Sequence, residues 1–362
     1  MTMGDQFPIK GRVSAWDGET LIAESEAAIA TDRVEANGGI LIPSADGSLI
    51  SHDPEALRIE VEDRWPNGGG TTNRFPRWGD VDDLLRLIDV QPAGDGAFTG
   101  PTYGDIRRNV VEGGQLLAMS MVAAAKSAPD KRVVNAHIVL ERPAVFDKPI
   151  DITVDRQRVG RQFATLSVRA TQGGKPVSSS LILLDHGSPD LITGQIAMPK
   201  VKAPEDCPAH DFGLLGRDVR FVNGDYDPDP DRIGPPELHC WIRHRDAPKE
   251  LYLQQALLAQ PVTHFTIAAA MLPHPGFGEA QAHYTLSTGV LTATLALHGE
   301  PDLTDWLLYT NPAIHAGRGL AQGQGHVFTR DGRLVASYTV QAMIRDFAAS
   351  ANESGLDSTR IM

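Results

Sequence analysis

Hydrophobic and polar residues alternate with a period of two near the C-terminus, over residues 334–345. The even-numbered positions are apolar and the odd-numbered ones include Gln341, so the segment predicts a strand with one buried face. Asp331-Gly332 comes directly before it, and this dipeptide tolerates positive φ, which favours a tight turn from a preceding strand over 320–329. A large amide at mid-strand is either solvated or placed to hold a ligand. Gln341 is therefore the first candidate site residue.

The same construction occurs earlier in the chain. A shift of 158 residues places Gly174 on Gly332 and Val177 on Val335. Solenoid repeats have periods of roughly 20–50 residues, so a repeat this long indicates a duplicated domain. The two copies differ at one point, because Leu183 occupies the position that corresponds to Gln341. Only the second copy has polar chemistry there.

The first copy opens near Val81 and continues into a run rich in Ala and Met that ends at Lys126. That run has the length and propensity of one buried helix. Four strands are predicted after it, over 132–141, 150–159, 163–172 and 177–185. One helix followed by an antiparallel meander is an α+β unit, whose sheet buries one face against the helix.

The second copy begins with a strand over 238–243. Two helical runs follow, 250–259 and 263–272, and Pro261 separates them because proline ends a helix. The remaining pattern predicts strands over 282–288, 291–298, 306–311, 320–329 and 334–345. Two copies in one chain can pair their sheets edge to edge, as in a fused symmetric dimer, which would place a ligand site between them.

The domain organisation follows from these patterns. Residues 1–80 contain short β-like runs, at 11–16, 20–24, 39–43 and 57–61, and end in a Gly-rich linker. We expect a small β-rich extension of unknown function at 1–80, a first domain at 81–190, a Pro-, Gly- and Asp-rich linker at 191–236, a second domain at 237–348 and a tail at 349–362.

Composition narrows the possible functions. The formal charge of −13 argues against a non-specific nucleic-acid binder, which needs a basic surface. No apolar run approaches the roughly 18 residues of a membrane span, and the N-terminus lacks a signal-peptide pattern, which predicts a cytoplasmic protein. The two cysteines, Cys207 and Cys240, lack metal-ligand spacing. No metal or redox cofactor is implied.

Several catalytic signatures are absent from the sequence. It contains no Gly-x-Ser-x-Gly elbow, no Walker loop and no His-Glu-x-x-His, which removes the sequence support for a serine hydrolase, a nucleotide hydrolase or a zincin. Aspartates alternate at 225, 227, 229 and 231, but prolines interleave them and the glycine of a calcium loop is missing. A rigid solvated linker is the favoured interpretation of that segment.

The best polar constellation lies in the second copy. Thr263 is expected to cap the helix 263–272, and the N–H groups of that helix start could polarise a carbonyl oxygen. His264 beside it could be a general base near neutral pH or a structural histidine. The following strands are rich in hydroxyl groups, which are either solvated or presented to a ligand: Thr285, Ser287, Thr288, Thr292 and Thr294.

These segments resemble the type II acyl-CoA thioesterases, which are double hotdog proteins. In the second half the resemblance rests on Asp302-Leu-Thr-Asp-Trp-Leu-Leu-Tyr309, on Arg318-Gly-Leu320 and on the segment 328–337 with Gln341. In the first half it rests on Val110-Val-Glu-Gly-Gly-Gln115 and on Ala136-His-Ile-Val-Leu-Glu-Arg-Pro143. Together the matches cover about residues 81–348.

The resemblance implies an α+β double hotdog in which each half wraps an antiparallel sheet around one helix. It implies hydrolysis of acyl-CoA thioesters to free acid and CoA, in lipid metabolism, by direct attack of water without an acyl-enzyme. The family's Asp, Thr and Gln orient that water, and Gln341 matches the Gln. Thr263 occupies the position of the Asp, with His264 next to it, and the Thr is expected among Ser287, Thr288 and Thr292.

Further expectations concern the substrate and the partners. Gly114, Gln115, His137 and Arg318 lie in the matching segments and are expected to contact the acyl-CoA substrate. A homodimer or higher homo-oligomer is expected, without a nucleic-acid partner. Because the family carboxylate is replaced, activity could be weak, with Thr263 and His264 taking its place.

Two other functions remain open from the sequence. One is a catalytically silent double hotdog that binds acyl thioesters or scaffolds a complex, which the replaced Asp favours. The other is a hotdog enoyl-CoA hydratase, which needs an acidic residue paired with a histidine at the head of the helix. Of that pair the sequence offers only His264.

Overall fold

The computed structural model describes residues 81–346 except 103–109, 146–147, 211–215, 223, 225, 228 and 283–284, and describes the backbone of six strands between residues 12 and 62. Contacts divide the chain after Arg77 into two compact units. In the first unit, β1 (Arg12–Asp17) pairs with β2 (Thr20–Ser25) and β6 (Leu57–Glu62), and β4 (Gly39–Pro43) pairs with β3 (Glu35–Ala36) and β5 (Leu49–His52). The assignment of residues 1–80 as a β-rich extension stays a prediction.

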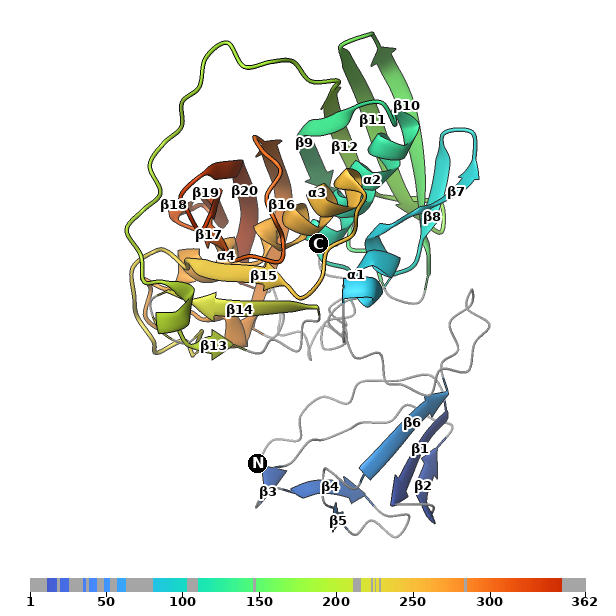
Figure 1. Ribbon diagram of the computed structural model, residues 1–362. Coiled ribbons are helices and arrows are strands. Elements are labelled where there is room, and N and C mark those ends of the chain that lie inside the picture. The colour runs from blue at the N-terminus through green and yellow to red at the C-terminus, as the bar shows by residue number, and fades with distance from the viewer. Residues whose placement is uncertain are drawn as a thin grey trace. The chain divides into compact units, whose positions relative to one another are not determined.

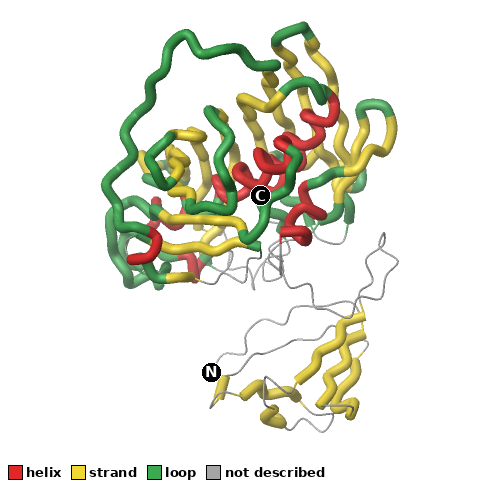
Figure 2. The backbone as a smooth tube through the Cα atoms, viewed as in Figure 1, coloured by secondary structure: helices red, strands yellow, loops and turns green. Residues whose placement is uncertain are grey.

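The second unit is built on one antiparallel sheet of fourteen strands (Figures 1 and 2). Its order is β13-β14-β15-β17-β19-β20-β16-β9-β12-β11-β10-β8-β7, and β18 pairs with β19. The strands that complete the first half are β7 (Gln91–Gly94), β8 (Ala97–Gly100), β9 (Arg132–Leu140), β10 (Ile150–Val159), β11 (Phe163–Gln172) and β12 (Lys175–Asp185).

The strands of the second half are β13 (Ala209–His210), β14 (Arg217–Phe221), β15 (Cys240–His244), β16 (Leu286–Leu297), β17 (Leu307–Thr310), β18 (Ala313–Gly317), β19 (Leu320–Thr329) and β20 (Leu334–Asp346). The two halves meet where β9 pairs with β16. The predicted edge-to-edge pairing of the two copies is therefore confirmed.

Helices pack against one face of this sheet, as Figure 1 shows for α2 and α3. They are α1 (Val81–Ile88), α2 (Gly113–Ser127), α3 (Leu251–Ala259) and α4 (Thr266–Met271), with 3₁₀ turns η1 (Pro204–Asp206), η2 (Gln260–Thr263) and η3 (Glu279–Gln281). Almost every residue of α2 is buried, because Ala, Met and Leu on all its sides meet the sheet or α3. None of the helices among the described residues is both long and apolar enough to cross a membrane.

The turns that define the repeat have the geometry that the sequence predicts. Gly173 and Gly174 between β11 and β12 have φ of 56° and 75°, and Gly332 between β19 and β20 has φ of 89°. Residues other than glycine rarely adopt these φ values. The two equivalent hairpins thus share a positive φ at Gly174 and Gly332, but they differ one residue earlier, where Gly173 has a positive φ and Asp331 does not.

The structure corrects three boundaries. One strand, β16, replaces the two predicted over 282–288 and 291–298, and a bulge between Val290 and Thr292 marks the predicted break. The helix predicted to start at Thr263 starts at Thr266, because η2 continues α3 to that point. The expected linker at 191–236 contributes η1, β13 and β14, so part of it belongs to the sheet.

Part of that segment also covers the face of the sheet that lies away from the helices. Met198 and Val201 pack on a second hydrophobic cluster of Cys207, Val222, Trp241, Trp306, Leu308 and Phe328. Gln195 adds hydrogen bonds to the β19–β20 hairpin, from its Nε2 to the Gly332 carbonyl at 2.7 Å and to its Oε1 from the Leu334 N–H at 2.9 Å. The long loop after β12 (Figure 1) is therefore anchored at its far end.

Candidate active site

The start of α2 lies tightly against η2. A Cβ placed on Gly114 would lie 1.9 Å from the carbonyl oxygen of Gln260 and 3.0 Å from Thr263 Oγ1. Only a residue without a side chain allows the two backbones to approach this closely. The start of α2 in the first half and η2 in the second half are thus in direct contact.

Glu112 precedes α2 in extended conformation and does not cap it with its side chain. Its Oε2 accepts a hydrogen bond from Gln260 Nε2 at 2.8 Å and lies 2.9 Å from His264 Nε2. The carboxylate and the imidazole come from different halves, 152 residues apart in sequence. This places a carboxylate beside His264, where the sequence had suggested that none was available.

Arg217, on β14, completes the cluster. Its Nη1 donates to Gln260 Oε1 at 2.6 Å, and its Nη2 lies 3.4 Å from His264 Nδ1. The amide of Gln260 therefore presents its oxygen to the guanidinium and its nitrogen to the carboxylate, which is the orientation that the two charges favour. Glu112, Gln260, His264 and Arg217 are called the dyad cluster below.

Exposure differs across the dyad cluster. The side chain of Glu112 is 33% exposed and that of His264 is 10% exposed, whereas Arg217 as a residue is only 4% exposed. Burial lowers the pKa of Arg217, and the negative charge of Glu112 opposes that shift. The carboxylate is thus the member that solvent reaches most easily.

Thr263 does not cap a helix. It is buried within η2, and α4 begins at Thr266 after Phe265, without a side-chain cap. The predicted capping role is wrong, because the 3₁₀ turn carries the chain from α3 towards α4 without an extended residue between them. The Thr263 hydroxyl instead lies near Gly114 at the contact between the halves.

The sheet face towards the helices carries one candidate hydroxyl. A Cβ on Gly113 would lie 3.8 Å from Val290 Cβ, so Val290 faces the start of α2. Thr288 is two residues earlier on the same regular stretch of β16 and therefore lies on the same face. Thr288 is buried and lies two residues along β16 from Val290, which contacts the start of α2.

Gln341 lies on the opposite face of the sheet from the dyad cluster. Its neighbour Val340 pairs with Gly323, where a Cβ would meet Thr266 Oγ1 of α4 at 2.8 Å. That contact identifies the face of Val340 as the helix face, and β20 alternates regularly there, so Gln341 points away from it. The hypothesis that Gln341 and His264 hold one water molecule is therefore not supported by the geometry.

Two further candidates share the outer face with Gln341. Thr292 pairs directly with Gln341 across the strands β16 and β20. His137 on β9 pairs with Thr294 of β16, and the His137 Nδ1 lies 2.8 Å from the Thr294 hydroxyl. These residues form a polar strip at the junction of the halves, on the side without helices.

The other predicted residues lie apart from the dyad cluster as well. Ser287 pairs with Arg345 and takes the face opposite to Thr288. Arg318 is an exposed turn residue with φ of 55°. Gln115 is buried inside α2, with its amide 4.0 Å from the Met119 sulfur, and its contact with substrate stays a prediction.

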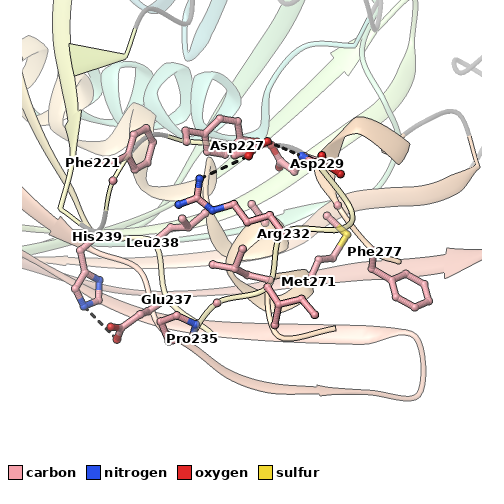
Figure 3. Close-up of a pocket in the computed structure, with 18 residues that line it drawn as sticks. Phe221, Asp227, Asp229, Arg232, Pro235, Glu237, Leu238, His239, Met271 and Phe277 are labelled. Atoms are coloured by element: carbon pink, nitrogen blue, oxygen red, sulfur yellow. Dashed lines mark hydrogen bonds and ion pairs between the residues drawn. The ribbon is translucent and has the colours of Figure 1, made fainter. Parts of the chain in front are cut away.

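A cavity of about 220 Å³ lies beside α4 (Figure 3). Its apolar wall includes Phe221, Leu238, Ala268, Met271 and Leu272. The polar rim includes Arg232, which lies 3.6 Å from Asp227, and Glu237, which lies 3.3 Å from His239.

Aromatic rings connect the wall of this cavity to the dyad cluster. Phe221 packs edge-on against Phe265, with ring centroids 5.4 Å apart, and Phe265 follows His264 and contacts its ring at 5.8 Å. Tyr226 stacks on Phe221 at 5.5 Å. The cavity and the dyad cluster are thus separated by one layer of aromatic side chains.

Sequence reasoning identified His264 but missed Glu112, Gln260 and Arg217. Glu112 stood inside the quoted segment 110–115, where a carboxylate directly before a Gly-Gly helix start is the signal that could have singled it out. Arg217 fell in the expected linker, and no local pattern marks it as buried. Their meeting depends on how two helices from different halves approach each other.

Comparison with known proteins agrees with this architecture. The acyl-CoA thioesterase N-terminal domain family matches residues 102–184, and its C-terminal domain family matches residues 198–344. "Acyl-CoA thioesterase 2" of Haemophilus influenzae is 28% identical, with alignment over 73% of this chain and 98% of that protein.

Solved structures show the same arrangement. The acyl-CoA thioesterase II TesB2 from Mycobacterium marinum is 26% identical, with a TM-score of 0.63 over 73% of this chain and 99% of that chain. A protein with a hot dog fold from Alicyclobacillus acidocaldarius, 18% identical, has a TM-score of 0.57 over 73% of this chain and 98% of its own. The double hotdog fold is confirmed. Because the two family domains together span more than half of the sequence, the chain belongs to the acyl-CoA thioesterase family, whose reaction is the hydrolysis of acyl-CoA thioesters.

Proposed function

We propose that this protein hydrolyses acyl-CoA thioesters by direct attack of water, with Glu112 as the general base. The observation that carries the proposal is the 2.9 Å contact between Glu112 and His264. It supplies a carboxylate for the second half, which has Thr263 where the family has its Asp. General-base assistance is typically worth about 10²–10⁴-fold in rate, so this replacement supports full rather than weak activity.

In the proposed step, Glu112 accepts a proton from the attacking water while the water oxygen forms a bond to the thioester carbon. The carbonyl oxygen gains negative charge. The first N–H groups of α2, at Gly113 and Gly114, lack partners within the helix by construction and can stabilise that charge, aided by the helix dipole. The C–S bond then breaks, and the CoA sulfur leaves with the proton that Glu112 returns.

The remaining neighbours hold the carboxylate in place. Gln260 and His264 both contact Oε2 of Glu112, which fixes the plane of the carboxylate. Thr288, on the same face of the sheet, is the hydroxyl best placed to contact the water or the carbonyl. No role follows for Gln341, Ser287, Thr292, His137 or Arg318 in this step, because they lie on the outer face or in an exposed turn.

The acyl chain extends into the cavity beside α4. The cavity wall is mostly apolar. His264 lies two residues before α4, and Ala268 and Met271 of α4 line that wall. Phe265 and Phe221 lie between the two sites, so their rings must move apart for a chain to enter. The site is proposed to work in the cytoplasm on soluble acyl-CoA, within a homo-oligomer.

The decisive experiment measures free-thiol release from acyl-CoAs of graded chain length. We expect turnover by the wild type and a loss of about 10²–10⁴-fold in kcat for Glu112→Gln. Glu250→Gln is the matched control, since Glu250 also precedes a helix without capping it and is exposed; it should leave kcat unchanged.

Two results would overturn the proposal. Full turnover by Glu112→Gln would remove Glu112 as the base, and tight acyl-CoA binding without turnover by the wild type would indicate a silent binding protein. A carboxylate and a histidine at a helix start are also what a hydratase needs, so loss of the double bond of 2-enoyl-CoA is followed in parallel. We expect no change in that signal.

A further inference from the structure

Arg217 and Lys131 are the two buried residues among the lysines and arginines of the described part of the chain, and Arg217 is 4% exposed. It lies on β14 and pairs with His244 of β15, and its Nε donates to no acceptor among the described residues. Burying a guanidinium is expensive unless its partners compensate the cost. The two partners that its Nη atoms reach are both members of the dyad cluster, Gln260 and His264.

The direction of the contact with His264 follows from chemistry. A guanidinium has only N–H donors, so the His264 Nδ1 that it faces at 3.4 Å must be the acceptor. A neutral imidazole that accepts at Nδ1 carries its proton at Nε2. That proton points at Glu112 Oε2, 2.9 Å away.

The other titratable groups around Arg217 are neutral at physiological pH. Burial lowers the pKa of His244 to about 3, and it raises the pKa values of Cys240 and Tyr309. Of the groups that act on Arg217, Glu112 is thus the charged one.

We propose that Arg217 is a positioning residue that holds His264 in the tautomer with its proton on Nε2, so that the imidazole donates to Glu112 and orients the carboxylate. This inference rests on the proposed function, since it gives Arg217 a role only if Glu112 is the base. Loss of Arg217 leaves the ring without the donor that selects this tautomer, so the carboxylate loses part of its orientation.

The first test is spectroscopic and does not depend on activity. Side-chain ¹⁵N resonances of histidine-labelled protein are recorded at pH 7, with His264→Gln to assign the signal. We expect the Nε2–H tautomer for His264 in the wild type. A cationic ring or an Nδ1–H tautomer at pH 7 would overturn the proposal even if the enzyme is fully active.

The second test uses Arg217→Met, with Arg220→Met on the same strand as control. We expect Arg217→Met to show a mixture of the Nδ1–H and Nε2–H tautomers at His264 and a kcat lowered about tenfold with little change in KM, because a less well oriented base costs rate. Arg220→Met should retain the wild-type tautomer and kcat. An unchanged tautomer and an unchanged kcat in Arg217→Met would contradict the inference.

Folding and function are separated by two further comparisons. If Arg217→Met does not fold, the wild-type tautomer still decides, and Arg217→Lys, which keeps a charge without the planar fork, is measured in its place. We expect Arg217→Lys to show a partly mixed tautomer at His264 and a kcat below that of the wild type. If the wild type shows the Nε2–H tautomer but releases no thiol, the proposed function fails while the geometry inferred for Arg217 stands.

Discussion

Glu112 and His264 belong to different copies of a duplicated domain, yet their side chains meet at 2.9 Å. The contact depends on the close approach of α2 and η2, where Gly114 lies directly against the Gln260 carbonyl. Neither copy contains both partners, because Glu112 lies in the first copy and His264 in the second. The site is thus a property of the fused pair.

The close approach of α2 and η2 predicts that alanine at Gly114 destabilises the protein, whereas alanine at Gly113 has little effect on its stability. In Gly114→Ala the new Cβ would overlap a backbone oxygen, so we expect a loss of roughly 1–3 kcal/mol in the free energy of unfolding and a displaced Glu112. In Gly113→Ala the Cβ would meet the flexible end of Leu140, at 2.7 Å from its Cδ1, and better helix propensity offsets the crowding. Urea denaturation and thiol release measure both, and equal destabilisation would contradict the geometry.

The placement of Gln341 gives a second prediction. Because it lies on the face of β20 opposite to α4, Gln341→Ala should keep kcat/KM within a few-fold of the wild type. His264→Ala removes a group that fixes Glu112, and misplacement of a catalytic group commonly costs up to about 10²-fold. If Gln341→Ala lost as much activity as His264→Ala, the face assignment could not be correct for the active protein.

Burial of His244 predicts a pH dependence of stability. Its pKa is lowered to about 3 in the folded protein, so between about pH 6.5 and pH 3 the unfolded chain binds a proton that the folded chain does not. Stability from this group is therefore complete above pH 6.5 and falls as the pH decreases, by about 1.4 kcal/mol per unit. Both ring nitrogens lack partners among the described residues.

We accordingly expect His244→Leu to flatten the dependence of unfolding free energy on pH between 6.5 and 4. His315→Leu, at an exposed position of β18, serves as the control and should keep the wild-type slope. Denaturation curves at four pH values are sufficient. An unchanged slope in His244→Leu would mean that His244 is protonated in the folded state.

The cavity beside α4 predicts chain-length selectivity. Ala268→Phe would fill much of its 220 Å³, so kcat/KM for acyl chains of twelve or more carbons should fall by about tenfold or more while that for acetyl-CoA changes little. Ala316→Phe, exposed on β18, is the matched control. A uniform decrease across all chain lengths would place the acyl chain elsewhere.

Much of the fold could be predicted because its signals are local. Strands β10, β11 and β19 have the boundaries that alternation predicts. Gly174 and Gly332 lie in turns at equivalent positions of the two copies, and both have positive φ. The break predicted within β16 was wrong, since Gly289 and the bulge interrupt the pattern without ending the strand. Local patterns also gave α2, whose composition is that of a helix buried on all sides.

The site could be predicted only in part, because its members are joined by tertiary contacts. His264 was visible as a polar residue at a helix break. Glu112 was not, since its role depends on a partner 152 residues away. Gln341 was correctly assigned to the face opposite the apolar stripe, but which face the helices cover cannot be read from one strand.

The pairing of β9 with β16 has a consequence for stoichiometry. A dimer of two identical hotdog chains is symmetric and offers two equivalent catalytic centres, whereas fusion leaves each copy free to diverge. Here the dyad cluster takes Glu112 from the first half and Gln260, His264 and Arg217 from the second. We therefore expect active-site titration to count one catalytic centre per polypeptide.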